Sequence, residues 1–150
     1  MIDEKITPHF HLSEFLASQD AVRFGIDNIP SALVLANIRN LLAPGLQYVR
    51  DKLGHPISIS SGYRCPELNT RVGGASNSDH MSGLAADFIC PGYGSPKQVC
   101  EAIIRSGVGF DQLIHEGTWV HISFDQRPRC QVLTAHFRRG HKTTYTVGLS

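Results

Sequence analysis

The run Ser-Asp-His-Met-Ser-Gly-Leu-Ala-Ala-Asp at residues 78–87 contains side chains that could carry out chemistry. His80 precedes an expected strand and Asp87 lies on it, so an imidazole and a carboxylate can converge there. His121 lies on a second expected strand. If the two strands pair, the three side chains form a site of two histidines and one carboxylate. Such a set leaves one position for water, which is typical of catalytic zinc and not of structural zinc.

The same residues also fit a purely structural interpretation. A histidine beside an apolar strand is often a hydrogen-bonded core or surface residue, and a single aspartate often lies at a turn or at a strand end. The residue types alone therefore leave both interpretations open.

Four short segments have the apolar patterns of strands, namely 57–61, 84–90, 112–115 and 119–124. Residues 117–118, Gly-Thr, predict a hairpin between the last two. On the last strand Trp119 and His121 share one face, while Val120 points to the other. The alternation therefore predicts that His121 faces away from the side chains that form the core.

Helices are expected at 9–18, from Ser31 to about Leu53, at 66–72 and at 96–106. Leucines and isoleucines recur every three or four residues after Ser31, and Pro44 should kink or split that helix. The stretch 62–83 is rich in Gly, Ser and Asn. A connection of this length in a compact domain is usually functional.

The helices precede most of the strands and the connections are short. The expected class is therefore α+β, a small antiparallel sheet with N-terminal helices packed on it. A length of 150 residues predicts one domain over residues 1–150, with its core at about 9–124 and a basic tail at 125–150. Within the tail, 132–137 and 143–147 are expected either to pair as edge strands or to stay partly loose.

The charge is nearly balanced, with 14 Lys and Arg against 13 Asp and Glu, so no electrostatic footprint for nucleic acid exists. The hydrophobic content of 41% argues against a disordered chain. The eight histidines are an excess. Only His80 and His121 enter the expected site, and His115 should point to the opposite face of its strand.

No apolar run is long enough for a secretory signal or for a membrane span. We therefore expect a chain that is cytoplasmic as synthesised and has no membrane span. We also expect a monomer. Cys65, Cys90, Cys100 and Cys130 have no CxxC spacing. Buried free thiols are the expectation for them, and disulfides formed after export are the alternative.

Three ordered elements of the chain resemble the zinc D,D-peptidases, which include D-Ala-D-Ala metallocarboxypeptidases and, more distantly, VanX-type D,D-dipeptidases and the hedgehog signalling domain. The elements are SxHxxGxAxD at 78–87, SGYR at 61–64 and WVH at 119–121. The resemblance covers about residues 9–124. The segments at 12–15 and 28–30 are similar to the small, often phage-encoded branch of this family.

The resemblance implies a hedgehog-like metallopeptidase fold and one Zn²⁺ held by His80, Asp87 and His121. It also implies that Arg64 faces the site and binds a substrate carboxylate or the developing oxyanion, a surface salt bridge being the alternative. Ser78 is expected to contact the substrate or to orient the His80 loop, unless it is only a structural cap. Trp119 is expected to line the substrate cleft.

The general base is less evident from the sequence. Hydrolysis at zinc needs a carboxylate that moves a proton from water to the leaving amine. Many relatives have an acid three residues before the last zinc histidine, where this chain has Thr118. We expect Glu116 to be the base, with Asp111 as second choice. A surface glutamate in a turn is the alternative for Glu116.

The function expected from the resemblance is zinc-dependent hydrolysis of peptide bonds in peptidoglycan stem peptides, by a carboxypeptidase or an endolysin-type endopeptidase. The enzyme would reach the wall after lysis, export or delivery with a phage. One alternative is an inactive zinc-binding module that binds the cell wall or belongs to a phage particle. A third hypothesis is a metal-free hydrolase in which Cys65 or Ser78 is the nucleophile and His80 the base. The sequence places no acidic residue that would orient the histidine for it.

Overall fold

The structure is a computed structural model that describes residues 3–150. In these residues six strands form one sheet in the order β3-β4-β6-β5-β7-β8. Every neighbouring pair is antiparallel except β5 and β7, which run parallel. The strands are β3 (Ser58–Ser61), β4 (Ala85–Ile89), β5 (Gln112–His115), β6 (Val120–Ser123), β7 (Gln131–His136) and β8 (Thr144–Val147). The α+β class is confirmed, and the parallel pair makes the sheet mixed.

The two faces of the sheet differ in chemistry, as alternation along β4 and β6 requires. Asp87 lies opposite His121 in the register of these two strands. Their neighbours Phe88 and Val120 point to the other face and are fully buried. One face therefore packs into the core, while the other carries the polar side chains of the expected site.

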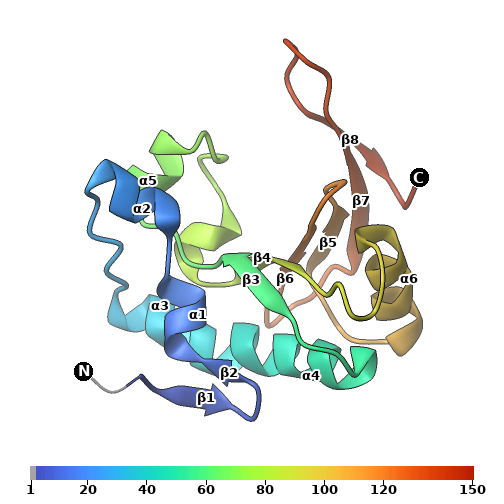
Figure 1. Ribbon diagram of the computed structural model, residues 1–150, viewed down its shortest axis with the longest axis horizontal. Helices are drawn as coiled ribbons and strands as arrows, with labels where there is room; N and C mark the ends of the chain where they lie inside the picture. The colour runs from blue at the N-terminus through green and yellow to red at the C-terminus, as the bar shows by residue number, and fades with distance from the viewer. Residues whose placement is uncertain (1–2) are drawn as a thin grey trace.

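Helices α4 (Ala43–Leu53) and α6 (Pro96–Ser106) cover the core face of the sheet (Figure 1). Ser95 caps α6, because its hydroxyl accepts from the Gln98 N–H at 3.2 Å and the Gln98 side chain accepts from the Ser95 N–H at 2.8 Å. A Cβ added at Gly45 of α4 would lie 2.5 Å from the Phe124 ring. Only glycine there allows α4 to approach the end of β6 so closely.

The long helix predicted from Ser31 to Leu53 is present but changes its geometry before Pro44. It consists of α3 (Ala32–Asn37), a π-helical turn η1 (Ile38–Leu42) and α4. The Ala43 N–H donates to the Ile38 carbonyl, five residues back. Proline lacks the N–H that an α-helix needs, and the wider turn absorbs that loss without ending the helix.

The N-terminal region contains elements that the sequence did not predict. A two-stranded sheet pairs β1 (Lys5–Thr7) with β2 (Phe10–His11), and α2 (Gln19–Phe24) follows α1 (Leu12–Leu16). The expected helix at 9–18 is thus shorter and begins at Leu12. Arg39 holds the N-terminal strands against the long helix through a bidentate ion pair with Glu4, at 3.0 and 2.7 Å.

The stretch between β3 and β4 is ordered by two short helices. These are α5 (Pro66–Arg71), which matches the expected helix at 66–72, and the 3₁₀ turn η2 (Asp79–Ser82). Asn69 donates its amide to the Ala75 carbonyl at 2.8 Å, which closes the turn between the two helices. This bond anchors the segment that leads to His80.

The C-terminal segment completes the sheet, so of the two outcomes expected for it the edge-strand pair is correct. Strand β7 pairs with β5, and β8 pairs with β7 at the sheet edge. Asp111, just before β5, accepts two side-chain hydrogen bonds from Arg129, just before β7, at 2.9 and 3.0 Å. The tip of this hairpin extends beyond the rest of the molecule (Figure 1).

Two further expectations concern the cysteines and membranes. All four cysteines are free, and Cys90 and Cys100 are buried as expected. The expectation is wrong for Cys130, which is exposed, and Cys65 is only partly buried. Cys130 lies in the irregular segment just before β7, outside the helices and strands that enclose the core. Within residues 3–150 no helix is both long and apolar enough to span a membrane.

Candidate metal centre and cleft

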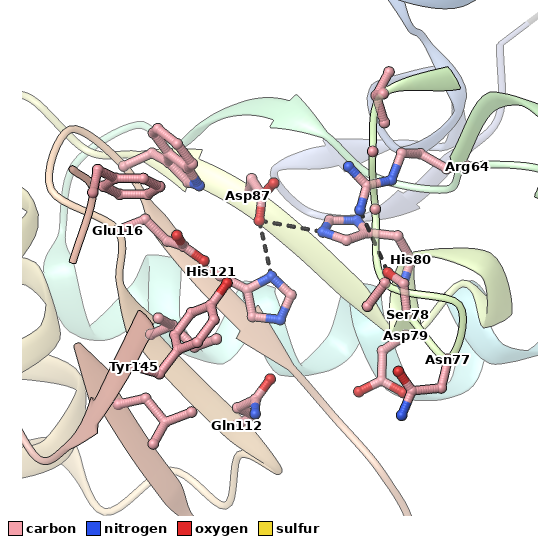
Figure 2. A pocket seen from close by; sticks show the side chains of 18 of the residues that line it. Arg64, Asn77, Ser78, Asp79, His80, Asp87, Gln112, Glu116, His121 and Tyr145 are labelled. Carbon is pink, nitrogen blue, oxygen red and sulfur yellow. Dashed lines mark hydrogen bonds and ion pairs between the residues drawn. The ribbon is translucent and has the colours of Figure 1, made fainter. Parts of the chain in front are cut away.

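Three side chains converge on the polar face of the sheet, as the sequence predicted. The His121 Nδ1 atom lies 2.9 Å from the Asp87 Oδ1 atom, and the His80 Nε2 atom lies 3.3 Å from the same oxygen (Figure 2). The two imidazole rings stand edge to face with centroids 5.1 Å apart. Asp87 comes from β4, His121 from β6 and His80 from η2.

The local sequence explains how His80 reaches this position. The Ser78 hydroxyl accepts from the His80 N–H at 3.2 Å and caps the 3₁₀ turn. Gly83 ends the turn with φ of +73°, the left-handed conformation that glycine favours. The turn therefore begins and ends at residues suited to it, and it presents His80 toward β4.

His80 is oriented by a hydrogen bond to the backbone of the preceding strand region. Its Nδ1 atom lies 2.7 Å from the Gly62 carbonyl oxygen. A carbonyl can only accept, so Nδ1 carries the proton and Nε2 keeps a free lone pair toward Asp87. An imidazole held in this way is the usual arrangement of a metal-binding histidine.

Burial and mutual contact perturb the ionisation of this group. Burial lowers the pKa of His80, although Asp87 opposes that effect. Burial alone would raise the pKa of Asp87, but its interactions with His121 and His80 outweigh that effect and hold the pKa well below the usual range. The site at neutral pH is thus an anionic carboxylate between two imidazole nitrogens.

The donor set fits a metal ion of the zinc type. One ligand atom from each of His80, Asp87 and His121 lies within 4.8 Å of the others. Two imidazole nitrogens and one carboxylate oxygen are the donors found in open catalytic zinc sites. Three donors leave a further position for water or substrate, so the arrangement could support hydrolysis.

The three side chains lie in a cleft of about 640 Å³. Its floor is the sheet. One wall is the segment from Val72 to His80, and the other is the C-terminal hairpin. The side chains that line it include Arg64, Ser78, Gln112, Glu116, Trp119, Leu133, Phe137 and Tyr145.

Glu116 lies in this cleft, at the end of β5. Gln112, Ile114 and Glu116 alternate onto the cleft face, and Glu116 is only 9% exposed. Burial raises the pKa of its carboxyl, and the nearby Asp87 charge adds to the effect while His121 opposes it. Figure 2 shows the carboxylate directed toward Asp87 and His121. A surface glutamate, the alternative interpretation, does not describe this position.

The other candidates near Glu116 lie elsewhere. Asp111, the second choice for the base, does not line the cleft, and hydrogen bonds from Arg129 lower the pKa of its carboxyl. His115 is absent from the cleft lining, in agreement with its expected place on the opposite face. The hairpin expected at 117–118 is present, and His115 pairs with Val120 across it.

Arg64 enters the cleft from the far side of His80 (Figure 2). Its Nη2 atom lies 3.4 Å from the Ser78 hydroxyl, and its buried Nε atom has no hydrogen-bond partner among the described residues. Burial lowers the pKa of the guanidinium, yet Asp87 helps to keep it charged. Arg64 lines the cleft, so its guanidinium could bind an anionic ligand there.

Ser78 combines two of the roles considered from the sequence. It caps the His80 turn and also contacts Arg64, so it is a structural cap that lies in the cleft wall. Trp119 lines the cleft as expected, and its ring packs on Phe137 with centroids 5.9 Å apart.

Sequence reasoning missed the contribution of the C-terminal segment to the cleft. Leu133, Phe137 and Tyr145 line the wall formed by β7, its turn and β8. The sequence predicted an edge-strand pair there as one of two outcomes, without a place at the site. Only the parallel pairing of β7 with β5 brings these residues to the site, and no local signal in the sequence specifies that pairing.

The fold and the site together define a class of protein. A histidine–aspartate–histidine group open to a cleft, with a buried carboxylate beside it, is typical of metal-dependent hydrolases. Residues 8–123 match the family model described as Peptidase M15. The chain therefore belongs to the M15 peptidase family, and the resemblance to zinc D,D-peptidases is confirmed.

A curated relative agrees with this assignment. The chain is 40% identical over 73 residues to the zinc D-Ala-D-Ala carboxypeptidase of Streptomyces albus G. The match covers 48% of this chain and 28% of that protein. The relative is thus much longer than the region that the two proteins share.

Proposed function

We propose that this protein is a zinc-dependent peptidase that hydrolyses peptide bonds in peptidoglycan stem peptides. The observation that carries the proposal is the placement of Glu116 in the same cleft as the His80, Asp87 and His121 donors. Family membership and the name of the Streptomyces relative support the reaction and the substrate class.

The residues take the following roles in the proposal. His80, Asp87 and His121 hold Zn²⁺, which when bound polarises the scissile carbonyl and makes water more acidic. Glu116 accepts a proton as water adds to the carbonyl carbon. It returns that proton to the amine nitrogen as the C–N bond breaks.

Arg64 binds a negative charge on the substrate, with Ser78 holding the guanidinium in place. Its Nε atom, which has no hydrogen-bond partner among residues 3–150, and its position across the three metal-donor side chains from Glu116 support this role. A terminal carboxylate of a stem peptide suits a guanidinium, because two parallel hydrogen bonds can form. This favours carboxypeptidase action, and an endopeptidase would direct Arg64 to the oxyanion instead.

The alternative of an inactive zinc-binding module rested on the threonine at position 118. Glu116 offers a carboxylate on the cleft side of the same turn. Its presence in the cleft supports the active enzyme over the inactive module.

The test is to incubate the zinc-loaded protein with a stem peptide ending in D-Ala-D-Ala and to follow products by mass spectrometry. We expect loss of terminal D-Ala. Glu116→Gln should lower kcat by about 10²- to 10⁴-fold with zinc content unchanged.

Glu101→Gln is the matched control, because Glu101 is exposed on α6 and lies outside the cleft. Its activity should equal that of the wild type. No product from the zinc-loaded wild type on this peptide or on cross-linked muropeptides would contradict the proposal, and full activity of Glu116→Gln would exclude Glu116 as the base.

A further inference from the structure

We propose that Tyr145 contacts the reacting peptide and donates a hydrogen bond from its hydroxyl to the scissile carbonyl oxygen as negative charge develops there. This inference rests on the proposed function and adds a residue outside the segment that matches the family model, which ends at residue 123.

The position of Tyr145 is fixed by the sheet. Tyr145 lies opposite Ala135 in the register of β7 and β8, and residues 131–134 of β7 pair with β5. The Thr134 hydroxyl donates to the Gly148 carbonyl at 2.7 Å, which fastens the end of β8 to β7. Tyr145 is therefore held on an ordered strand beside the cleft.

A second contact fixes the hairpin against the site. The Phe137 ring, after β7, packs on Trp119, which precedes β6. Trp119 lies two residues before the metal-donor candidate His121, so the contact ties the C-terminal wall to the strand that carries the site. The hydrogen bond at the end of β8 and the Phe137–Trp119 contact together hold this wall in place.

The Tyr145 side chain is directed into the cleft and not along its rim. Figure 2 shows its hydroxyl pointing toward the space between Glu116 and His121. Arg64 lies on the other side of the three candidate metal ligands. Tyr145 lines the cleft while remaining 52% exposed. No hydrogen bond within residues 3–150 engages its hydroxyl, so a bound substrate can receive it.

The chemistry of the phenol suits this place. Burial raises the pKa of Tyr145, and the charges of Glu116 and Asp87 add to that effect. The phenol is therefore protonated at neutral pH and can donate a hydrogen bond. A hydrogen-bond donor that lies where negative charge develops stabilises the transition state more than the ground state. Such a donor therefore raises kcat.

Roles are thereby divided between the two walls of the cleft. Arg64 and Ser78 lie at the wall formed by residues 72–80, where they can hold a charged end of the substrate. Tyr145 lies at the opposite wall, beside Glu116, where water addition and proton transfer would occur. A Phe at this position would keep the wall but lose the donor.

The test compares Tyr145→Phe with the wild type as full-length, zinc-loaded proteins on the stem peptide. We expect kcat to fall by about 100-fold, with KM and zinc content unchanged, because the ring and the strand pairing stay intact. A phosphinate analogue of the scissile bond, which imitates the tetrahedral transition state, should lose affinity by a similar factor.

Tyr48→Phe is the control, since Tyr48 is a partly exposed tyrosine of α4 that does not line the cleft. An unchanged kcat in Tyr145→Phe, or a rise in KM alone, would overturn the inference while leaving the proposed function intact. A wild type without turnover would overturn both.

Discussion

Gly62 shows how one residue without a side chain supports the site. Its carbonyl oxygen fixes the tautomer of His80, and its Cα lies against the backbone of α1 at Phe15. Any added Cβ would collide with the Phe15 carbonyl, which is backbone and cannot rotate away. The position of a metal-ligand candidate thus depends on the close approach of two backbone segments.

Replacing Gly62 by Ala should therefore weaken zinc binding. The Cβ would displace the Gly62 carbonyl from the His80 ring, and loss of such an outer contact typically costs about 10- to 100-fold in metal affinity. Competition with a chromophoric chelator measures the change.

Gly109→Ala is the matched control, because a Cβ there meets only Pro128 at an ordinary 3.8 Å. Zinc affinity in Gly62→Ala equal to that of Gly109→Ala would show that the Gly62 carbonyl does not position His80.

Among the elements, the β7–β8 hairpin depends on an ion pair at its base. Asp111 is 7% exposed and its carboxylate binds the Arg129 side chain through two hydrogen bonds. The Arg129 N–H donates to the same carboxylate at 3.1 Å. These contacts bring the chain into parallel register with β5, so the carboxylate has a structural role beside the cleft.

Asp111→Asn should lower the free energy of unfolding at pH 7 by about 1 to 2 kcal/mol, as expected for charge-assisted hydrogen bonds to a partly exposed partner. Arg129 lowers the pKa of Asp111, so the stabilisation is complete above the unfolded value of about 3.9 and is lost as pH falls through the native value. Urea unfolding at pH 7 and pH 3 measures both effects.

The control is Asp20→Asn, which removes an exposed pair with Arg23 on α2. That change should cost about 0.5 kcal/mol or less. Equal losses for the two variants, or a difference between wild type and Asp111→Asn that grows toward acid, would contradict the structural role of Asp111.

The helices and strands that are marked by local sequence patterns were predicted best. Alternation placed His121 on the face opposite Val120, and the serine at 31 and the proline at 96 marked the starts of two helices. The π turn before Pro44 was predicted only as a kink or a split of the helix, because proline signals a disruption without specifying its form. The short β1–β2 pair has too few residues to show a period.

Considered as a whole, the molecule builds its cleft from segments far apart in the chain. The sheet supplies the floor, the stretch after β3 one wall and the last strands the other. The convergence of His80, Asp87 and His121 was predictable, because two neighbouring strands carry two of the three side chains. The second wall was not, because the β5–β7 pairing joins strands through long-range contacts that no local pattern encodes.

The central claim is that one zinc ion binds between His80, Asp87 and His121, with Glu116 beside it and free to act as a base. A crystal structure of the zinc-loaded protein, with anomalous difference maps above and below the zinc absorption edge, tests it most directly. We predict a single peak at about 2.0–2.2 Å from His80 Nε2, His121 Nδ1 and an Asp87 oxygen, with Glu116 outside the coordination sphere. A peak elsewhere, no peak, or Glu116 as a zinc ligand would contradict it.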